Sequence, residues 1–207
     1  MITSNLVQLE RSQINQASEI LTKAFDDDPV LNCLLSQSDR MKTNALKSLF
    51  KGILLTSLPY NHIYTTVGSL KGVAAWLPPN HSHLNIFHFL PTVFSLTFKL
   101  GFFKVGRLIS TLSVLEKHHK RDLSQPHWYL NLLGVSPAHQ GQGIGSLLLQ
   151  PILQQADSQR LPCYVETSTP KAVCFYQKNG FEVLKTLDLL EASSLIWTMK
   201  REPLSIK

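Results

Sequence analysis

Apolar residues in the first part of the chain recur at the spacing of amphipathic helices. From Ile14 to Phe25 they lie three or four residues apart, which predicts a helix with one buried face. Asp28 can cap the turn that follows, and Pro29 can open it. A short strand over Leu6–Leu9 is predicted before this helix. A second helix is predicted where six apolar side chains share one face: Met41, Leu46, Leu49, Phe50, Ile53 and Leu54.

Short apolar segments bounded by turn residues predict the strands. The pair 62–67 and 70–77 is joined at Gly68-Ser69 and closed by Pro78-Pro79. Beyond residue 127 the prediction is a strand 128–135, a helix 143–157, a strand 163–167, a helix 170–179 and strands 182–187 and 195–199. This order predicts an α/β (α+β) fold, with a mixed sheet flanked by helices, in a single domain over residues 1–207.

The segment from Leu84 to Leu115 is apolar enough to raise the question of a transmembrane helix. Pro91, Lys99 and Gly101 interrupt it, so no window of the required length is free of breaks. We therefore predict no integral membrane span, but a helical insertion over residues 84–120 that is buried or lines a groove. Peripheral contact with a membrane is the alternative interpretation.

Composition and charge narrow the class of protein. The chain has 207 residues, of which 43% are hydrophobic and 16% charged, which is enough for a folded core. The net charge of +6 favours an anionic partner, but the basic residues are scattered, so we predict no nucleic-acid partner. Three cysteines without metal-ligand spacing predict no metal and a reducing compartment. With no apolar run behind a basic start at the N-terminus, we expect a cytoplasmic protein. We expect a monomer or a homodimer.

A glycine loop precedes the helix predicted at 143–157. Gly141, Gly143 and Gly145 let the backbone approach a ligand closely, and the first turn of a helix offers free N–H groups to a phosphate. A nucleotide P-loop would need a lysine where Ser146 and Leu147 stand. A dinucleotide fold would need its glycines directly after the strand, with different spacing. Coenzyme A is the third ligand, although three glycines before a helix can also be just a tight connection.

Two motifs resemble those of the GCN5-related N-acetyltransferases (GNAT). One is Q-x-x-G-x-G at Gln140, Gly143 and Gly145, after a strand that ends in Leu-Leu-Gly-Val; the other is YVETSTPKAVCFYQKNGFEVL. The second motif is closer still to the group of puromycin N-acetyltransferase. The resemblance implies a GNAT-type sheet, twisted and mostly antiparallel, and acetyl-CoA as co-substrate. It is continuous over residues 128–183, whereas the helical insertion does not match convincingly.

The resemblance also implies where the coenzyme is held. Main-chain groups of Leu133, Gly134 and Val135 are expected to meet the pantetheine arm and the thioester oxygen. The pyrophosphate is expected on the N–H groups of five residues, with the Gln140 side chain as a helper. These five are Gly141, Gly143, Ile144, Gly145 and Ser146.

Two side chains are implied in catalysis. Tyr176 stands where the family places the acid that protonates the leaving thiolate, and Glu166 can take a proton from the amine, directly or through water. Each also has a structural interpretation: Tyr176 as a core aromatic, and Glu166 as a hydrogen-bond acceptor for its neighbours. Cys174 is expected to pack as a small apolar residue, and His119 to lie on the surface.

The reaction implied is direct transfer of acetyl from acetyl-CoA to the primary amine of a small molecule in a ternary complex. The enzyme would thus be an acyltransferase. Two alternatives stay open: a regulatory module that binds coenzyme A without turnover, and an acyltransferase that works at a membrane surface. The acceptor amine cannot be chosen from the sequence, because the helical insertion that would shape its site differs from the family.

Overall fold

The computed structural model describes residues 5–35, 39–81, 86–189 and 194–204. Its strands are β1 (Leu6–Gln8), β2 (Ile63–Thr66), β3 (Gly72–Leu77), β4 (Trp128–Val135), β5 (Cys163–Thr167), β6 (Glu182–Leu189) and β7 (Ser194–Arg201). Its α-helices are α1 (Ile14–Ala24), α2 (Pro29–Leu35), α3 (Asp39–Ser57), α4 (Ile86–Leu100), α5 (Phe102–Asp122), α6 (Ile144–Gln159) and α7 (Pro170–Lys178). Short 3-10 helices lie at Arg11–Gln13, Leu58–Tyr60 and Pro137–His139.

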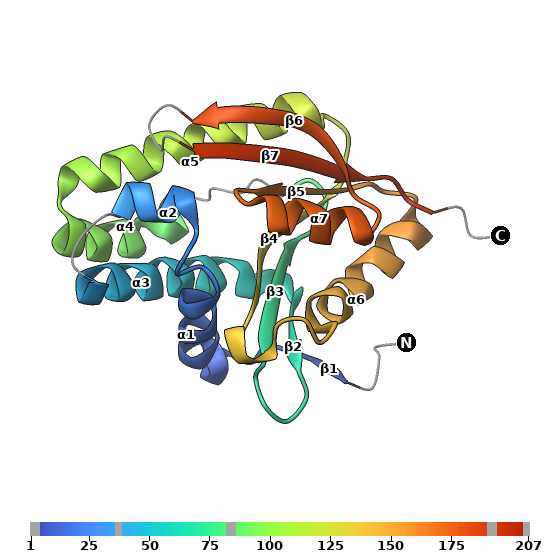
Figure 1. Ribbon diagram of the computed structural model, residues 1–207, viewed down its shortest axis with the longest axis horizontal. Helices are drawn as coiled ribbons and strands as arrows, with labels where there is room; N and C mark the ends of the chain where they lie inside the picture. The colour runs from blue at the N-terminus through green and yellow to red at the C-terminus, as the bar shows by residue number, and fades with distance from the viewer. Residues whose placement is uncertain (1–4, 36–38, 82–85, 190–193, 205–207) are drawn as a thin grey trace.

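The strands form one seven-stranded sheet in the order β1-β2-β3-β4-β5-β7-β6 (Figure 1). Every pairing is antiparallel except β4 with β5, which is parallel. The predicted mixed, mostly antiparallel sheet flanked by helices is thus confirmed. The predicted strands all occur, and β6 and β7 run slightly longer than the sequence indicates.

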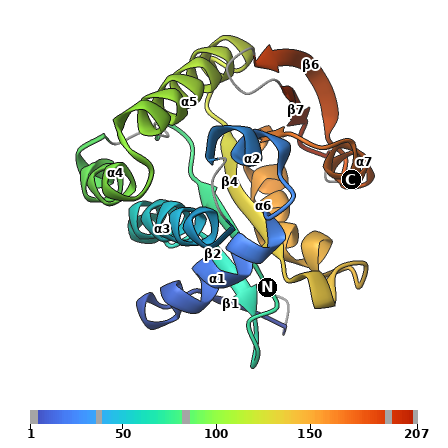
Figure 2. The same cartoon turned by 60° about the vertical axis from the view of Figure 1, so that its left-hand side comes forward.

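Helices cover both faces of the sheet and enclose two separate cores. Figure 2 shows α1, α3, α4 and α5 on one side of the central strands, with α6 on the other. The first core contains buried residues of α1 to α5, and the second contains those of α6 and α7. β3 is buried along its whole length and alternates between the two: Val73 and Ala75 face the first core, and Ala74 and Trp76 face the second.

A bulge at Asn131 changes the phase of β4. Ala75 pairs with Leu132 and Trp76 with Leu130, so Asn131 is an extra residue on β4. Before the bulge, Trp128 and Leu130 pack in the second core, whereas Leu132 packs in the first. An uninterrupted strand would have put Leu130 and Leu132 on the same face.

The predicted helical insertion forms a hairpin of α4 and α5, broken at Gly101, which has a positive φ of 81°. Residues 84 and 85 of the predicted range lie outside the described residues. α4 packs along α3, and a Cβ on Gly52 of α3 would come within 2.1 Å of Thr92 on α4. Among the described residues, no helix combines the length and apolarity needed to cross a bilayer.

Candidate active site

The parallel strands β4 and β5 pair at only two positions. Trp128 is opposite Cys163 and Tyr129 is opposite Tyr164, and beyond these pairs the two strands separate (Figure 1). The residues that follow on both strands, Leu130–Val135 and Val165–Thr167, line one cavity of about 840 Å³. The centre of the sheet is therefore open, and the cavity reaches from one helical layer to the other.

All eleven candidate site residues line this cavity. They come from the end of β4, the glycine loop, the first turn of α6, β5 and α7: Leu133, Gly134, Val135, Gln140, Gly141, Gly143, Ile144, Gly145, Ser146, Glu166 and Tyr176. The fold thus brings together segments that are more than forty residues apart in the sequence.

The glycine loop leads into α6 with its backbone exposed. Gly141 and Gly143 have positive φ values of 75° and 77°, and a Cβ at either position would meet no heavy atom within 4 Å. The first helical hydrogen bond runs from the Leu147 N–H to the Gly143 carbonyl, which leaves the earlier N–H groups for a ligand. A Cβ on Gly145 would instead lie 3.0 Å from Cζ of Phe175 on α7. The loop therefore presents exposed backbone N–H groups at the start of a helix, an arrangement that suits a pyrophosphate.

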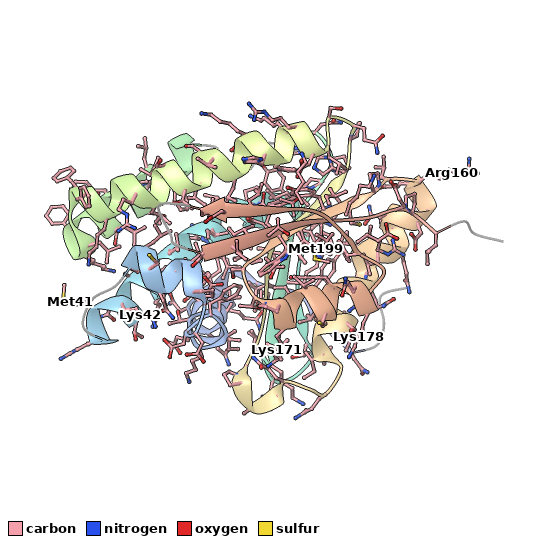
Figure 3. The ribbon with its side chains drawn as sticks, turned by 45° about the horizontal axis from the view of Figure 1, so that its top comes forward. Met41, Lys42, Arg160, Lys171, Lys178 and Met199 are labelled. Carbon is pink, nitrogen blue, oxygen red and sulfur yellow. The ribbon has the colours of Figure 1, made fainter. Side chains whose placement is uncertain are left out.

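The Gln140 side chain links the glycine loop to the end of β4 and to α7 by hydrogen bonds. Its Nε2 donates to the Val135 carbonyl at 3.2 Å, and its Oε1 accepts from Nζ of Lys171 at 3.3 Å. Lys171, labelled in Figure 3, lies in the first turn of α7 and lines the cavity. The sequence gives no sign of this cation, because the spacing of Lys171 does not indicate that α7 starts beside the glycine loop.

The end of β4 contributes a free backbone edge. Its other edge is paired with β3 as far as Val135, but the edge toward β5 is open beyond Tyr129. Gly134 has a further structural role, because a Cβ there would come within 2.7 Å of the Leu21 side chain on α1. The absence of a side chain at this position lets α1 pack against β4.

Glu166 is a half-buried carboxylate held by two tyrosines. Its Oε2 accepts from the Tyr129 hydroxyl at 3.1 Å, and its Oε1 accepts from the Tyr164 hydroxyl at 3.3 Å. Burial raises the pKa of Glu166 to about 7; the two hydroxyls lower it, and the nearby Asp122 and Glu116 raise it. A carboxyl with this pKa exchanges protons readily near neutral pH, as a general base must.

His119 of α5 supports the two tyrosines. Its ring stacks on Tyr164 at 4.3 Å and on Tyr129 at 4.9 Å between centroids, and its Nε2 lies 2.5 Å from Nε2 of His127. The side chain is 5% exposed, so the prediction of a surface histidine is wrong. Burial, together with the charge of His127, lowers the pKa of His119 to about 3 and keeps its ring neutral. The missed signal is helical spacing, since Leu108, Leu112, Leu115 and His119 lie on one face of α5.

Phe175 and Tyr176 are adjacent on α7 but pack against different parts of the protein. Phe175 packs against Gly145, whereas the Tyr176 ring is 7% exposed and packs against Phe181 at 5.6 Å between centroids. Burial raises the pKa of Tyr176, so its hydroxyl stays protonated at neutral pH. Cys174, which precedes both residues, is exposed, and this contradicts the predicted buried position. Its place on α7 turns it away from the face that carries Tyr176.

The three aspartates before α2 differ in their contacts. Asp28 caps α2 by accepting from the Leu31 N–H at 2.8 Å, and it also accepts from the Ser168 hydroxyl after β5. Asp26 pairs with Lys42 at 3.0 Å. Asp27 and Asp28 line the cavity. Capping by Asp28 is confirmed, whereas the turn predicted to open at Pro29 is the start of helix α2.

Comparison with known proteins agrees with this geometry. Residues 100–183 match the family model described as an acetyltransferase (GNAT) domain. An uncharacterized N-acetyltransferase of Schizosaccharomyces pombe is 25% identical over 204 residues, and the alignment covers 95% of this chain and 82% of the relative. A probable serine/threonine-protein kinase of Dictyostelium discoideum is also 25% identical over 196 residues. The match covers 85% of this chain but only 20% of that kinase, so the chain spans about a fifth of that relative.

Solved structures share the whole fold. A histone acetyltransferase HPA2 and related acetyltransferase from Corynebacterium glutamicum aligns with a TM-score of 0.69 at 20% identity, covering 98% of both chains. The polyamine N-acetyltransferase of Drosophila melanogaster aligns with a TM-score of 0.66 at 19% identity, covering 95% of this chain and 98% of that one.

The sheet is mostly antiparallel and opens between two parallel strands, with a glycine loop at the opening. Residues 100–183 match the GNAT acetyltransferase domain, and the chain as a whole shares the fold of solved acetyltransferases.

Proposed function

We propose that this protein transfers the acetyl group of acetyl-CoA to the primary amine of a small molecule, directly and within a ternary complex. The observation that carries the proposal is Glu166, a carboxylate with a pKa of about 7 in the same cavity as the glycine loop. A base at one side of the open sheet and an anion cradle at the other are the two parts that such a reaction requires.

The residues present fit the coenzyme. The N–H groups of Gly143, Ile144 and Gly145 would hold the pyrophosphate, with Lys171 adding a positive charge at 3.3 Å from Gln140. Bound acetyl-CoA supplies an activated thioester. The free edge of β4 at Leu133–Val135 would bind the pantetheine arm, and one of its N–H groups would donate to the thioester oxygen.

Proton transfers follow from the two side chains. Glu166 as carboxylate accepts a proton from the acceptor's ammonium group, which frees the nitrogen lone pair to attack the carbonyl carbon. The carbon–nitrogen bond forms as the carbon–sulfur bond breaks. The Tyr176 hydroxyl donates a proton to the departing thiolate, and Glu166 takes the second proton from nitrogen after its first has passed to solvent. Tyr176 then regains a proton from solvent and Glu166 releases its second one, so both side chains return to their starting states. Amine and acetyl-CoA thus give amide and free thiol.

The wall opposite Glu166 favours an amine with an apolar body. It is built from α3, α4 and α5 and is lined by Phe50, Ile53, Phe89, Leu108 and Leu112. The carboxylates of Glu116 and Glu166 lie at the polar side of the cavity. An arylalkyl or branched aliphatic amine would place its ammonium group there and its body against the wall.

Release of free thiol from acetyl-CoA tests the proposal, with phenethylamine, isoamylamine, spermidine and agmatine as acceptors. We expect thiol release above the hydrolysis rate with the first two amines. Tyr176→Phe and Glu166→Gln should each lower kcat by about a hundredfold or more while a thermal shift with acetyl-CoA is retained. A thermal shift without turnover on any amine would support the regulatory module instead. No thermal shift and no turnover would refute coenzyme binding.

A further inference from the structure

The outer side of the α4–α5 hairpin carries an exposed apolar stripe. Leu90, Phe94 and Phe98 follow one another at intervals of four residues on α4, so they lie on one face. Phe102 and Phe103 open α5 directly after the Gly101 turn. The exposed fractions of the four phenylalanines are 68% for Phe94, 79% for Phe98, 86% for Phe102 and 79% for Phe103. We call these five residues the hairpin stripe.

The hairpin stripe is not needed to complete the fold. The opposite faces of both helices already pack in the first core through Phe89, Leu96, Val105 and Leu108. Phe94 and Phe98 contact each other at 4.8 Å between ring centroids but remain exposed. Single exposed apolar residues are common on protein surfaces, whereas four exposed phenyl rings within ten residues indicate a surface that binds a partner.

The charge around the hairpin stripe indicates its partner. From Arg40 to Leu115 the chain contains no Asp or Glu, although it has 14 such residues in total. The same stretch contains eight Lys or Arg residues: Arg40, Lys42, Lys47, Lys51, Lys71, Lys99, Lys104 and Arg107. Lys42 and Lys47 pair with carboxylates of Asp26 and Glu19. Lys99, Lys104 and Arg107 belong to the hairpin itself. Lys99 also donates to the Ser48 hydroxyl of α3, and the Arg107 guanidinium lies 3.9 Å from Sγ of Cys33.

We propose that the hairpin stripe docks the protein on the surface of an anionic phospholipid bilayer. Phenyl rings enter the interface between headgroups and acyl chains, while neighbouring cations meet lipid phosphates. A second copy of this chain fits less well, because a symmetric contact would bring two segments without acidic residues against each other. This proposal does not rest on the proposed function, since none of the stripe residues lines the active-site cavity.

Co-sedimentation of the full chain with vesicles tests the proposal. We expect binding to vesicles of phosphatidylcholine with a third phosphatidylserine, and much weaker binding to phosphatidylcholine alone. Binding should fall by about a hundredfold in the double variant Phe98→Ser, Phe102→Ser, since each ring that leaves the interface loses about tenfold. Lys104→Glu should also weaken binding at least about tenfold, through loss of an attraction and gain of a repulsion.

Matched controls separate docking from unfolding. Val67 and Leu204 are also exposed, at 51% and 65%, but lie away from the hairpin, so Val67→Ser, Leu204→Ser should leave binding unchanged. Both double variants should melt within a few degrees of the wild type and keep its acetyl-CoA thermal shift. In a Phe103→Trp variant, anionic vesicles should shift the fluorescence emission of the introduced side chain to shorter wavelength.

Three results would overturn the proposal. The first is no sedimentation with anionic vesicles at low ionic strength. The second is equal loss of binding in the Val67, Leu204 control. The third is a wild-type dimer in solution that Phe98→Ser, Phe102→Ser dissociates, without vesicle binding, which would assign the stripe to contact between copies.

Discussion

Glu166 illustrates how strand geometry sets the chemistry of a single residue. Tyr129 and Tyr164 form the last ladder pair between β4 and β5, and Glu166 follows two residues later on the same face as Tyr164. The carboxylate therefore stands where the strands begin to separate, within reach of both hydroxyls. Its pKa results from opposition between burial, which raises it, and these hydroxyls, which lower it.

Removal of the Tyr129 hydroxyl should move the pH profile of catalysis. In the proposed mechanism Glu166 acts as a carboxylate, so kcat/KM should rise with pH through a midpoint near 7 in the wild type. In Tyr129→Phe the carboxylate loses a hydrogen-bond donor, so its pKa rises and the midpoint moves up by about one pH unit. Rates measured between pH 5.5 and 9 check this. Tyr60→Phe, outside the cavity, should keep the wild-type midpoint, and an unmoved midpoint in Tyr129→Phe would exclude Glu166 as the base.

Glu166 should also cost the protein stability at high pH. Its pKa is higher in the folded state, about 7, than the ordinary value of 4.5, so the folded state binds its proton more tightly. The stability due to this proton is fully present below about pH 4.5 and is lost as pH rises through 7. Between pH 5 and pH 8 the wild type should therefore lose on the order of 2 kcal/mol of unfolding free energy through Glu166, and Glu166→Gln should not show this loss. Urea unfolding of both proteins at the two pH values measures these free energies. The same change between pH 5 and pH 8 in both proteins would contradict the raised pKa.

At the scale of elements, most of the fold follows from the sequence. The apolar periodicity of α1 and α3 and the turn residues around β2 and β3 predict those elements well, because each is a local pattern. The order of β5, α7, β6 and β7 follows from the same kind of signal. α2 was predicted only as a turn, since seven residues are too few to show a helical period.

Features that depend on contact between distant segments could not be predicted. The bulge at Asn131 leaves no mark in the apolar pattern of the β4 sequence, and it is visible only in the pairing with β3. The same holds for Lys171, which reaches the glycine loop because α7 begins beside it. The motif identified Glu166 and Tyr176 as candidates, but the tyrosine pair that holds Glu166 needed the fold.

The glycine loop allows a matched test of ligand binding. Gly143 and Gly68 have nearly the same positive φ, 77° and 78°, and a Cβ at either would meet no heavy atom within 4 Å. Alanine at each position should therefore cost about 1 kcal/mol of stability for the same reason, backbone strain. Only Gly143→Ala should weaken acetyl-CoA binding, by about tenfold or more, because its Cβ would enter the anion cradle. Calorimetric titration measures both affinities, and equal losses would show that strain alone is responsible.

At the scale of the molecule, two cores hold a sheet that is open at its centre. One buried ion pair joins the second half of the sheet to α6: Arg201 of β7 donates to both oxygens of Asp157, at 2.7 and 2.9 Å. The Asp157 Oδ1 also accepts from the Leu204 N–H at 2.8 Å. These bonds tie the end of β7 and the residues after it to α6.

Loss of this pair should destabilise the whole fold. Arg201→Met leaves the Asp157 carboxylate, whose side chain is 16% exposed, without its ionic partner. We expect the free energy of unfolding to fall by about 3 kcal/mol, because an uncompensated carboxylate stays largely buried. Lys47→Met removes the exposed pair with Glu19 and should cost less than about 1 kcal/mol. Denaturant unfolding distinguishes the two, and similar small losses would mean that the buried pair contributes little.

The narrow contact between β4 and β5 divides the chain as well as the sheet. Strands β1 to β4 and helix α6 precede the exposed, left-handed turn at Arg160, labelled in Figure 3, and strands β5 to β7 follow it. A chain cut at this turn yields two fragments whose shared sheet interface is two ladder pairs. Reassembly of such fragments would depend chiefly on side chains, Asp157 with Arg201 among them. A ligand that contacts both β4 and β5 in the cavity would hold the two fragments together. Complementation between the fragments would therefore report directly on ligand binding in the cavity.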